Sequence, residues 1–224
     1  CDFNYMVNHI VVQIKGTCNR GKYIGLKIEN KLKLLMLIIA SNRLKKIPIL
    51  YPCYPNIQDY IKSTNIPISF QDNDIIIDNR PIVNKQDIIY DSNAIQLVVF
   101  TSGTSGFPKP CSLTYNNLYE SALMWNQVIQ FNIKDIYLNH MPITHVSGLC
   151  IFFRALYNNF KMVLNDFSTE NYIHYLKKNK INLISMVPSM LEKIIKDNSQ
   201  LEILRNLKSV IVGGSPVNDK LLNL

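Results

Sequence analysis

Residues 97–110, LVVFTSGTSGFPKP, join an apolar run directly to a loop rich in threonine, serine and glycine. The run covers residues 95–100, and short apolar runs bounded by turn signals are typical of a buried strand. Gly103 and Gly106 tolerate positive φ, so the loop can turn several backbone N–H groups toward one point. Such a concave nest binds anions. The stretch therefore predicts a strand that leads into an anion-binding loop.

The side chains of this loop are suited to a phosphate. Lys109 contributes a point charge, and hydroxyl groups come from Thr101, Ser102, Thr104 and Ser105. A Walker loop is excluded, because no second glycine and no Ser/Thr stand at the required positions around Lys109. A dinucleotide-binding fingerprint is excluded as well, because its third glycine and downstream acidic residue are missing. We expect the loop to bind a nucleotide polyphosphate.

Residues 101–109 resemble the signature loop of the adenylate-forming superfamily, which comprises acyl-CoA synthetases, luciferases and adenylation domains. Its members carry Thr-Ser-Gly-Thr-Ser/Thr-Gly-x-Pro-Lys after a strand, and this chain matches without a gap. Pro110 departs from the usual glycine. Because proline lacks an N–H and fixes φ, the turn after Lys109 is expected to be less mobile. The alternative is an ordinary Ser/Thr-rich surface turn, and two further matches count against it.

The second match is the Pro-x-x-His motif at residues 142–145, at the distance after the loop that the superfamily shows. The resemblance implies that His145 lies beside the acyl carboxylate and the adenylate, and that Ser147 and Gly148 belong to the substrate site. From the residues alone, Ser147 is expected to cap an apolar helix over residues 148–157.

Arg154 follows His145 by nine residues in this otherwise apolar helix. A buried charge is costly unless it is paired, so composition alone favours an arginine that reaches the surface. However, His-Val-Ser-Gly-Leu followed by arginine at this spacing is similar to the o-succinylbenzoate-CoA ligases of menaquinone and phylloquinone synthesis. This resemblance implies that Arg154 pairs with a substrate carboxylate, a task that suits a bidentate guanidinium.

The third match follows a strand expected at residues 208–212, where Gly213, Gly214, Ser215 and Pro216 come next. In the superfamily, a strand that ends in Gly-Gly-Ala/Ser-Pro lets the backbone approach the adenine and the acyl group. Glycines at the carboxyl end of a strand suit such an approach. A plain turn is the alternative.

Composition narrows the class of protein. The chain has 224 residues, 47% of them hydrophobic, and a formal net charge of +8, which allows a sizeable core in one or two domains. Its lysines are scattered among Asn and Ile, which argues against nucleic-acid binding. The five cysteines form no C-x-x-C pair, so neither disulfides nor a metal site are expected.

Location and chain ends are expectations of the same kind. No apolar run is long enough to span a bilayer, and a cytoplasmic location is expected. The chain starts at Cys1 and stops at Leu224, soon after an expected strand, so both ends are expected to be truncated.

Apolar periodicity and turn residues predict alternating strands and helices. Thr114 is expected to cap a helix, and Trp125 to pack on that helix's apolar face. The expected strands cover residues 10–14, 23–29, 47–50, 66–70, 74–77, 95–100, 136–139, 161–164, 181–187 and 208–212, and the expected helices cover residues 30–46, 56–63, 114–130, 148–157, 169–178 and 189–196.

This rhythm predicts an α/β fold of mostly parallel sheets flanked by helices, and the resemblance implies the N-terminal domain of the adenylate-forming fold, truncated. Residues 1–94 are expected to form a first, partial α/β subdomain. Residues 95–224 are expected to form a second, which carries the phosphate loop and the acyl site.

The resemblances imply a reaction in which ATP and a carboxylate give an acyl-adenylate and pyrophosphate, and the acyl group then passes to coenzyme A. The implied ligands are ATP, Mg²⁺, coenzyme A and a small-molecule carboxylate, with o-succinylbenzoate favoured. The loop would stabilise the pyrophosphate charge, and Lys109 and His145 would be the catalytic residues. A fatty-acyl or aryl acid ligase and an inactive nucleotide-binding fragment stay open. The superfamily's later motifs would lie beyond Leu224, so little adenylation is expected from this chain alone.

Overall fold

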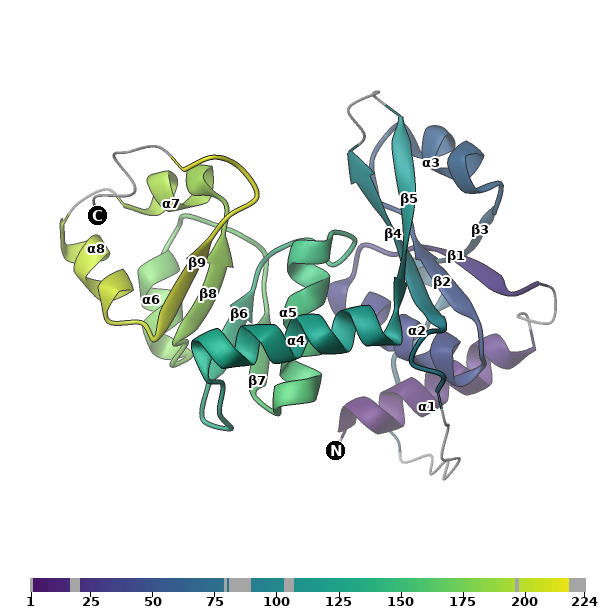
Figure 1. The fold of residues 1–224 in the computed structure, drawn as a ribbon, viewed down its shortest axis with the longest axis horizontal. Helices are drawn as coiled ribbons and strands as arrows, with labels where there is room; N and C mark the ends of the chain where they lie inside the picture. The colour runs from purple at the N-terminus through teal and green to yellow at the C-terminus, as the bar shows by residue number, and fades with distance from the viewer. Residues whose placement is uncertain are drawn as a thin grey trace. The chain divides into compact units, whose positions relative to one another are not determined.

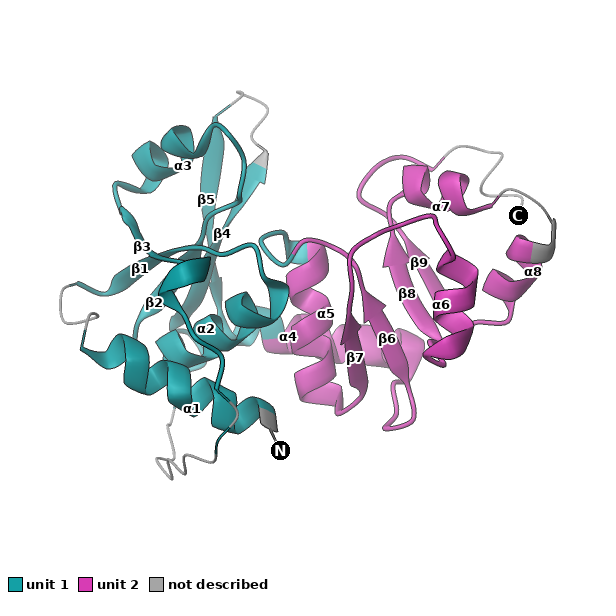
Figure 2. Ribbon diagram, turned by 180° about the vertical axis from the view of Figure 1, so that it is seen from behind, with its two compact units in different colours: residues 1–118, 143–146 teal, residues 119–142, 147–224 magenta. Residues whose placement is uncertain are grey.

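The computed structural model describes residues 2–16, 21–78, 80, 90–102, 107–195 and 198–217. Helices and strands alternate along most of the chain (Figure 1). They form two compact units, residues 1–118 with 143–146 and residues 119–142 with 147–224 (Figure 2). The expected α/β architecture of mostly parallel sheets flanked by helices is confirmed, with one sheet in each unit.

The first unit is built on a five-stranded sheet in the order β3-β1-β2-β4-β5. Its neighbouring strands are parallel except β4 and β5, which form an antiparallel pair. The elements are α1 (Asp2–Lys15), β1 (Tyr23–Lys27), α2 (Lys31–Arg43), β2 (Ile47–Leu50), α3 (Ile57–Thr64), β3 (Ile68–Gln71), the 3₁₀ turn η1 (Asp72–Asp74), β4 (Ile95–Ser102) and β5 (Pro108–Thr114).

Helices cover this sheet. The α3 helix packs on the sheet face that carries Ile49 and Phe100, while α1 lies beside α2, as Figure 1 shows. The α2 helix is buried along most of its length, and its Asn30 cap accepts a hydrogen bond from the Lys33 N–H at 3.0 Å. Capping of this kind satisfies one of the donors that a helix start leaves open.

The second unit is built on a four-stranded parallel sheet in the order β7-β6-β8-β9. Tyr137 and Leu183 lie on the face covered by α5 and the end of α4, and Leu138 and Ile184 lie on the face covered by α6, α7 and α8. The elements are α4 (Tyr115–Ile129), which begins in the first unit, β6 (Ile136–Asn139), α5 (Val146–Asn158), β7 (Lys161–Leu164), α6 (Tyr172–Lys178), β8 (Leu183–Met186), α7 (Pro188–Ile194), α8 (Asn198–Arg205) and β9 (Ser209–Val212).

Most predicted elements are present, and β2, β6 and β7 have the predicted bounds. Thr114 caps α4 as expected, because its hydroxyl accepts from the Asn117 N–H at 3.1 Å and its own N–H donates to the Asn117 side chain at 3.0 Å. None of the helices in the described ranges is long and apolar enough to cross a membrane.

The strand expected at residues 10–14 is wrong, because this segment belongs to the helix α1. Val7, Ile10 and Ile14 are fully buried, whereas Val12 is 62% exposed. An amphipathic helix buries residues three and four positions apart, but a strand would have buried Val12 with its neighbours at 10 and 14. The strand was predicted because residues 10–14 are a run of mostly apolar, β-branched residues, and the helical spacing of three to four residues becomes clear only over the longer segment.

The strand expected at residues 74–77 is also wrong. The 3₁₀ turn η1 ends at Asp74, whose carboxylate accepts from the Gln71 N–H at 2.7 Å. The backbone of Ile76 then bonds to the Gln13 side chain, with its N–H at 3.1 Å and its C=O at 2.7 Å. A glutamine from α1 thus takes the place of a neighbouring strand.

The helix α8 and the strand β5 were also not predicted. The sequence of β5 contains Pro108 and Pro110, which lack the N–H that an interior strand needs. It is tolerated because β5 lies at the edge of its sheet, where proline is acceptable.

The units divide the chain differently from the expected subdomains. Residues 95–114 were assigned to the second subdomain, but β4 and β5 belong to the sheet of the first unit, since β4 pairs with β2 at Ile49 and Val98. The expected boundary after residue 94 does not coincide with the division at residues 118 and 119.

Gly25 in β1 has no room for a side chain. A Cβ there would collide with the Pro67 carbonyl oxygen and lie 2.8 Å from Cε2 of Tyr51. We expect Gly25→Ala to lower the free energy of unfolding by about 1–3 kcal/mol, the usual range for overpacking. Urea denaturation would measure it, with Gly16→Ala as the control, because nothing lies within 4 Å of a Cβ at Gly16. Equal stability of the two variants would contradict the crowding of Gly25.

Candidate active site

The predicted phosphate loop lies at the tip of the β4–β5 hairpin. Gly103, Thr104, Ser105 and Gly106 lie outside the described residues, so their predicted role stays a prediction. Thr101 pairs directly with Lys109 across the two strands, and directly opposed residues project from the same face of a sheet. A hydroxyl and an ammonium group therefore flank the tip on one face. Thr101 and Lys109 are both exposed.

His145 lies in the first unit, where its Nε2 is 2.9 Å from the Tyr54 hydroxyl. Tyr54 follows the carboxyl end of β2, and its ring centroid is 6.3 Å from that of His145. This hydrogen bond fixes the orientation of the imidazole. Tyr54 was not among the predicted site residues, because nothing in the local sequence links it to a histidine 91 positions away.

A series of ring contacts links His145 to the end of β4. Tyr54 lies edge-on to Tyr60, with centroids 6.5 Å apart, and Tyr60 lies edge-on to Phe100 at 5.0 Å. Phe100 directly precedes Thr101. The structure therefore brings the predicted histidine and the base of the predicted phosphate loop together through one aromatic cluster.

Burial lowers the pKa of His145. Desolvation disfavours the charged form of a histidine, so the imidazole is neutral at pH 7. A neutral imidazole has one donor and one acceptor nitrogen, and Nε2 is the nitrogen that bonds to a described residue, the Tyr54 hydroxyl.

Gly148 lies in the first turn of α5, close to the chain that precedes the helix. A Cβ there would collide with the Pro142 carbonyl oxygen and lie 2.8 Å from the Met141 carbonyl oxygen. The carbonyl of Gly148 accepts a buried hydrogen bond from Asn139 Nδ2 at 2.8 Å. Packing alone therefore requires a glycine at this position. The helix already begins at Val146, so Ser147 is in its first turn and is not the cap that was predicted.

The predicted Gly-Gly-Ser-Pro segment follows β9 and is exposed at Gly213, Gly214, Ser215 and Pro216. Gly213 N–H donates to the Met186 carbonyl at 3.2 Å, which holds the segment beside the end of β8. Gly214 has φ +87°, a conformation that favours glycine.

Composition alone had favoured an arginine that reaches the surface. In the structure, Arg154 is only 8% exposed and so does not reach it. Its guanidinium carbon lies 4.3 Å from the ring centroid of Trp125 in α4. Arginine over an aromatic face is attracted by the ring's quadrupole. Trp125 thus packs within the fold as predicted, but its partner is the charged guanidinium of Arg154.

No carboxylate among the described residues forms an ion pair with Arg154. Its Nε is buried without a hydrogen-bond partner in this part of the chain. A guanidinium carries a permanent charge and a fork of donors that fits a carboxylate. Among the described residues, no side chain supplies an anion to this guanidinium.

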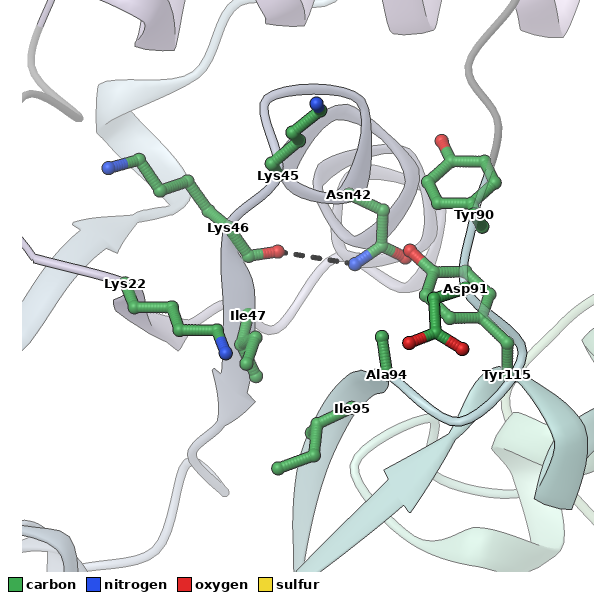
Figure 3. Close-up of a pocket in the computed structure, with 10 residues that line it drawn as sticks. All are labelled: Lys22, Asn42, Lys45, Lys46, Ile47, Tyr90, Asp91, Ala94, Ile95 and Tyr115. Atoms are coloured by element: carbon green, nitrogen blue, oxygen red, sulfur yellow. Dashed lines mark hydrogen bonds between the residues drawn. The ribbon is translucent and has the colours of Figure 1, made fainter.

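A cavity of about 270 Å³ lies at the end of the first sheet where the strands β1, β2 and β4 begin (Figure 3). It is lined by Lys22, Asn42, Ile47, Asp91 and Tyr115, among others. β4 extends from this end to the hairpin tip, a distance of roughly 23 Å at 3.3 Å per residue. The cavity is therefore separate from Ser102 and Pro108, which pair at the far end of β4 and β5.

Within the described ranges, no group of three or more His, Cys, Asp or Glu side chains could hold a metal ion.

A family model described as AMP-binding enzyme matches residues 46–223. The chain belongs to the AMP-binding enzyme family. This family assignment confirms the resemblance carried by the loop at residues 101–109.

Among curated relatives, the chain is 34% identical over 136 residues to the 2-succinylbenzoate--CoA ligase of Listeria innocua, a match that covers 60% of this chain and 29% of the ligase. It is 27% identical over 151 residues to the ligase of that name from Staphylococcus aureus, covering 67% of this chain and 30% of the ligase. The chain thus matches less than a third of the length of these relatives.

Among solved structures, the o-succinylbenzoate coenzyme A synthetase (MenE) of Bacillus subtilis, in complex with ATP and magnesium ion, superposes with a TM-score of 0.80 at 19% identity. The match covers 99% of this chain and 50% of the synthetase. A McyG A-PCP structure complexed with phenylalanyl-adenylate gives a TM-score of 0.83 at 15% identity, over 99% of this chain and 42% of that one. At these identities the likeness shows the fold, and the chain has the fold of the N-terminal part of adenylate-forming enzymes.

The low pKa of His145 makes the stability of the chain dependent on pH. An unfolded histidine titrates near pH 6.5, so between that pH and the lower pKa of the folded state the unfolded chain binds more protons. We expect the contribution of His145 to be complete above about pH 6.5 and to be lost as the pH falls toward the folded pKa.

Urea denaturation midpoints of the wild type and His145→Gln between pH 5 and 8 would test this expectation. The difference between the two proteins should change through this range, and His174→Gln, at an exposed position of α6, is the matched control. A pH-independent difference would contradict the burial of His145.

Proposed function

We propose that the protein containing this chain activates a carboxylate with ATP and transfers it to coenzyme A, with o-succinylbenzoate as the acid. In the first step a carboxylate oxygen of the acid bonds to the α-phosphorus of ATP, and the bond to pyrophosphate breaks. In the second step the sulfur of coenzyme A bonds to the acyl carbon, AMP leaves, and the thiol proton passes to solvent. This scheme needs no oxidant or reductant.

The observation that supports the choice of acid is the guanidinium of Arg154. It is buried, has no carboxylate partner among the described residues, and lies on α5, which starts directly after His145. A simple fatty or aryl acid has a single carboxylate, which the reaction consumes. An acid with a second carboxylate would neutralise Arg154 and keep its first carboxylate free to react. The similarity to 2-succinylbenzoate--CoA ligases supports the same choice.

The other residues are proposed in the following roles. Thr101, Lys109 and the loop residues Ser102, Gly103, Thr104, Ser105 and Gly106 bind the phosphates of ATP. His145, held by Tyr54, orients the reacting carboxylate or the adenylate, and Ser147 and Gly148 line the substrate site. Gly213, Gly214, Ser215 and Pro216 form one wall of the adenine site.

The proposal also covers ligands and location. A related synthetase has been solved in complex with ATP and magnesium ion, and we propose ATP, Mg²⁺ and coenzyme A as the ligands here, in the cytoplasm. Nucleic acid is not a proposed partner. The expected division into subdomains at residues 1–94 and 95–224 stays a prediction.

The test is pyrophosphate release by the protein from the complete reading frame, with ATP, magnesium and a panel of acids. We expect selective release with o-succinylbenzoate. Arg154→Ala should lower kcat/KM for this acid by roughly thirtyfold to several thousandfold, because removing one partner of a buried charge pair costs about 2–5 kcal/mol.

The control is Arg80→Ala, at an exposed arginine that pairs with Asp78. Release with fatty or simple aryl acids instead would keep the family and reject the proposed substrate. No release with any acid would favour an inactive nucleotide-binding protein.

A further inference from the structure

We propose that Trp125 is a positioning residue that holds the Arg154 guanidinium, and that this contact sets the preference for acids with a second carboxylate. The inference rests on the proposed function, because it concerns how the group that would meet that carboxylate is oriented. Trp125 itself is not proposed to touch the reacting atoms.

The contact joins two helices of the second unit. Trp125 belongs to α4 and Arg154 to α5, and the guanidinium carbon lies 4.3 Å from the indole centroid. Such pairs are attractive within about 6 Å and are strongest when desolvated. Arg154 is only 8% exposed, so this contact is largely desolvated and falls among the stronger cation–π pairs.

The guanidinium carbon lies over the indole ring, whose π face attracts the charge without accepting the N–H donors of the side chain as a carboxylate would. The N–H donors of a guanidinium lie in its plane, so a ring stacked on the face fixes the plane without using the donors. The buried Nε, which has no partner among the described residues, is one such donor. The contact with Trp125 thus restricts a flexible side chain while Nε keeps no partner among the described residues, and such ordering before binding reduces the ordering cost of binding.

The groups around Arg154 on the sheet side are neutral. The Tyr137 hydroxyl interacts with the Arg154 side chain through a hydrogen bond and through its charge; both act to lower the pKa of Tyr137, but burial outweighs them and raises that pKa. The Tyr137 hydroxyl in turn bonds to the Ser185 hydroxyl of β8. Arg154 also acts to lower the pKa of Cys150, which burial raises. Neutral neighbours orient the guanidinium without neutralising it, so its charge stays available to a ligand.

Packing alone does not require a tryptophan here. On α4, Leu118 and Ala122 are almost fully buried, whereas Trp125 is only partly buried. The two helices are also joined by Asn158, whose Nδ2 donates to the Ala122 carbonyl at 3.3 Å. An aliphatic residue could fill the space at position 125, but it would have no π face for the guanidinium.

Kinetics of the full-length enzyme provide the first test. We expect Trp125→Leu, which keeps apolar volume, to raise the KM for o-succinylbenzoate about three- to thirtyfold, the range expected for loss of a cation–π contact. The KM for ATP should not change. Trp125→Phe restores a π face and should recover most of the loss, and Val128→Ala, at a position 74% exposed on the same helix, is the matched control.

A double-mutant cycle separates positioning from a general effect on structure. If Trp125 acts through Arg154, Trp125→Leu should have no further effect on KM when Arg154 is already alanine. Additive effects, or a KM unchanged by Trp125→Leu while Arg154→Ala raises it, would overturn this inference and leave the proposed function intact. An acid KM that neither substitution changes would overturn the proposed role of Arg154, and absence of pyrophosphate release would overturn both.

Fluorescence tests the contact without activity. Trp125 is the only tryptophan in the 224 residues, so the emission of this chain reports on its surroundings. Arg154→Met should shift the emission, and Arg80→Met, at an exposed arginine, should not. Unchanged emission in Arg154→Met would overturn the stacked arrangement on which the inference depends.

Discussion

The close approach of Gly148 to the carbonyl groups of Met141 and Pro142 is the constraint on which the candidate active site depends. It forces a sharp turn between β6 and α5, and the buried hydrogen bond from Asn139 to the Gly148 carbonyl holds that turn. His145 lies within the turn, and Arg154 follows on the helix. A larger residue at position 148 would move the start of the helix away from these carbonyl groups. The Pro-x-x-His motif is thus a structural motif as much as a chemical one.

The sequence predicts an element well where its apolar pattern coincides with the face that the fold buries. β2, β6 and β7 are short apolar runs between turn residues, and each has the predicted bounds. Prediction fails where a distant partner decides. The Gln13 side chain forms hydrogen bonds with the backbone N–H and C=O of Ile76, which a neighbouring strand would otherwise use. The position of β5 at the edge of its sheet makes its prolines acceptable. Neither contact leaves a trace in the local pattern.

The candidate site shows the same division. Consecutive motifs identify the loop, His145 and the Gly-Gly-Ser-Pro segment, because their residues are neighbours in sequence. The partners of these residues are missed: Tyr54 meets His145, and Tyr137 lies near Arg154, through space only. Trp125 was expected to pack, and it does, but periodicity could not say that its packing partner is an arginine. Local sequence identifies residues that are able to bind or react, and tertiary structure decides their orientation and charge state.

A buried charge without a counter-ion is a cost that folding must offset elsewhere. At Arg154 part of that cost is offset by the face of Trp125 and by neutral hydroxyl groups, both of which stabilise a cation weakly compared with a carboxylate. An internal aspartate or glutamate would stabilise the fold more, but it would also occupy the donors that a ligand needs. Weak stabilisation by a π face is therefore consistent with an arginine that is kept ordered for an external anion. Under the proposed function, the absence of a counter-ion among the described residues is a functional feature, because the unsatisfied guanidinium then contributes free energy to binding and not to folding.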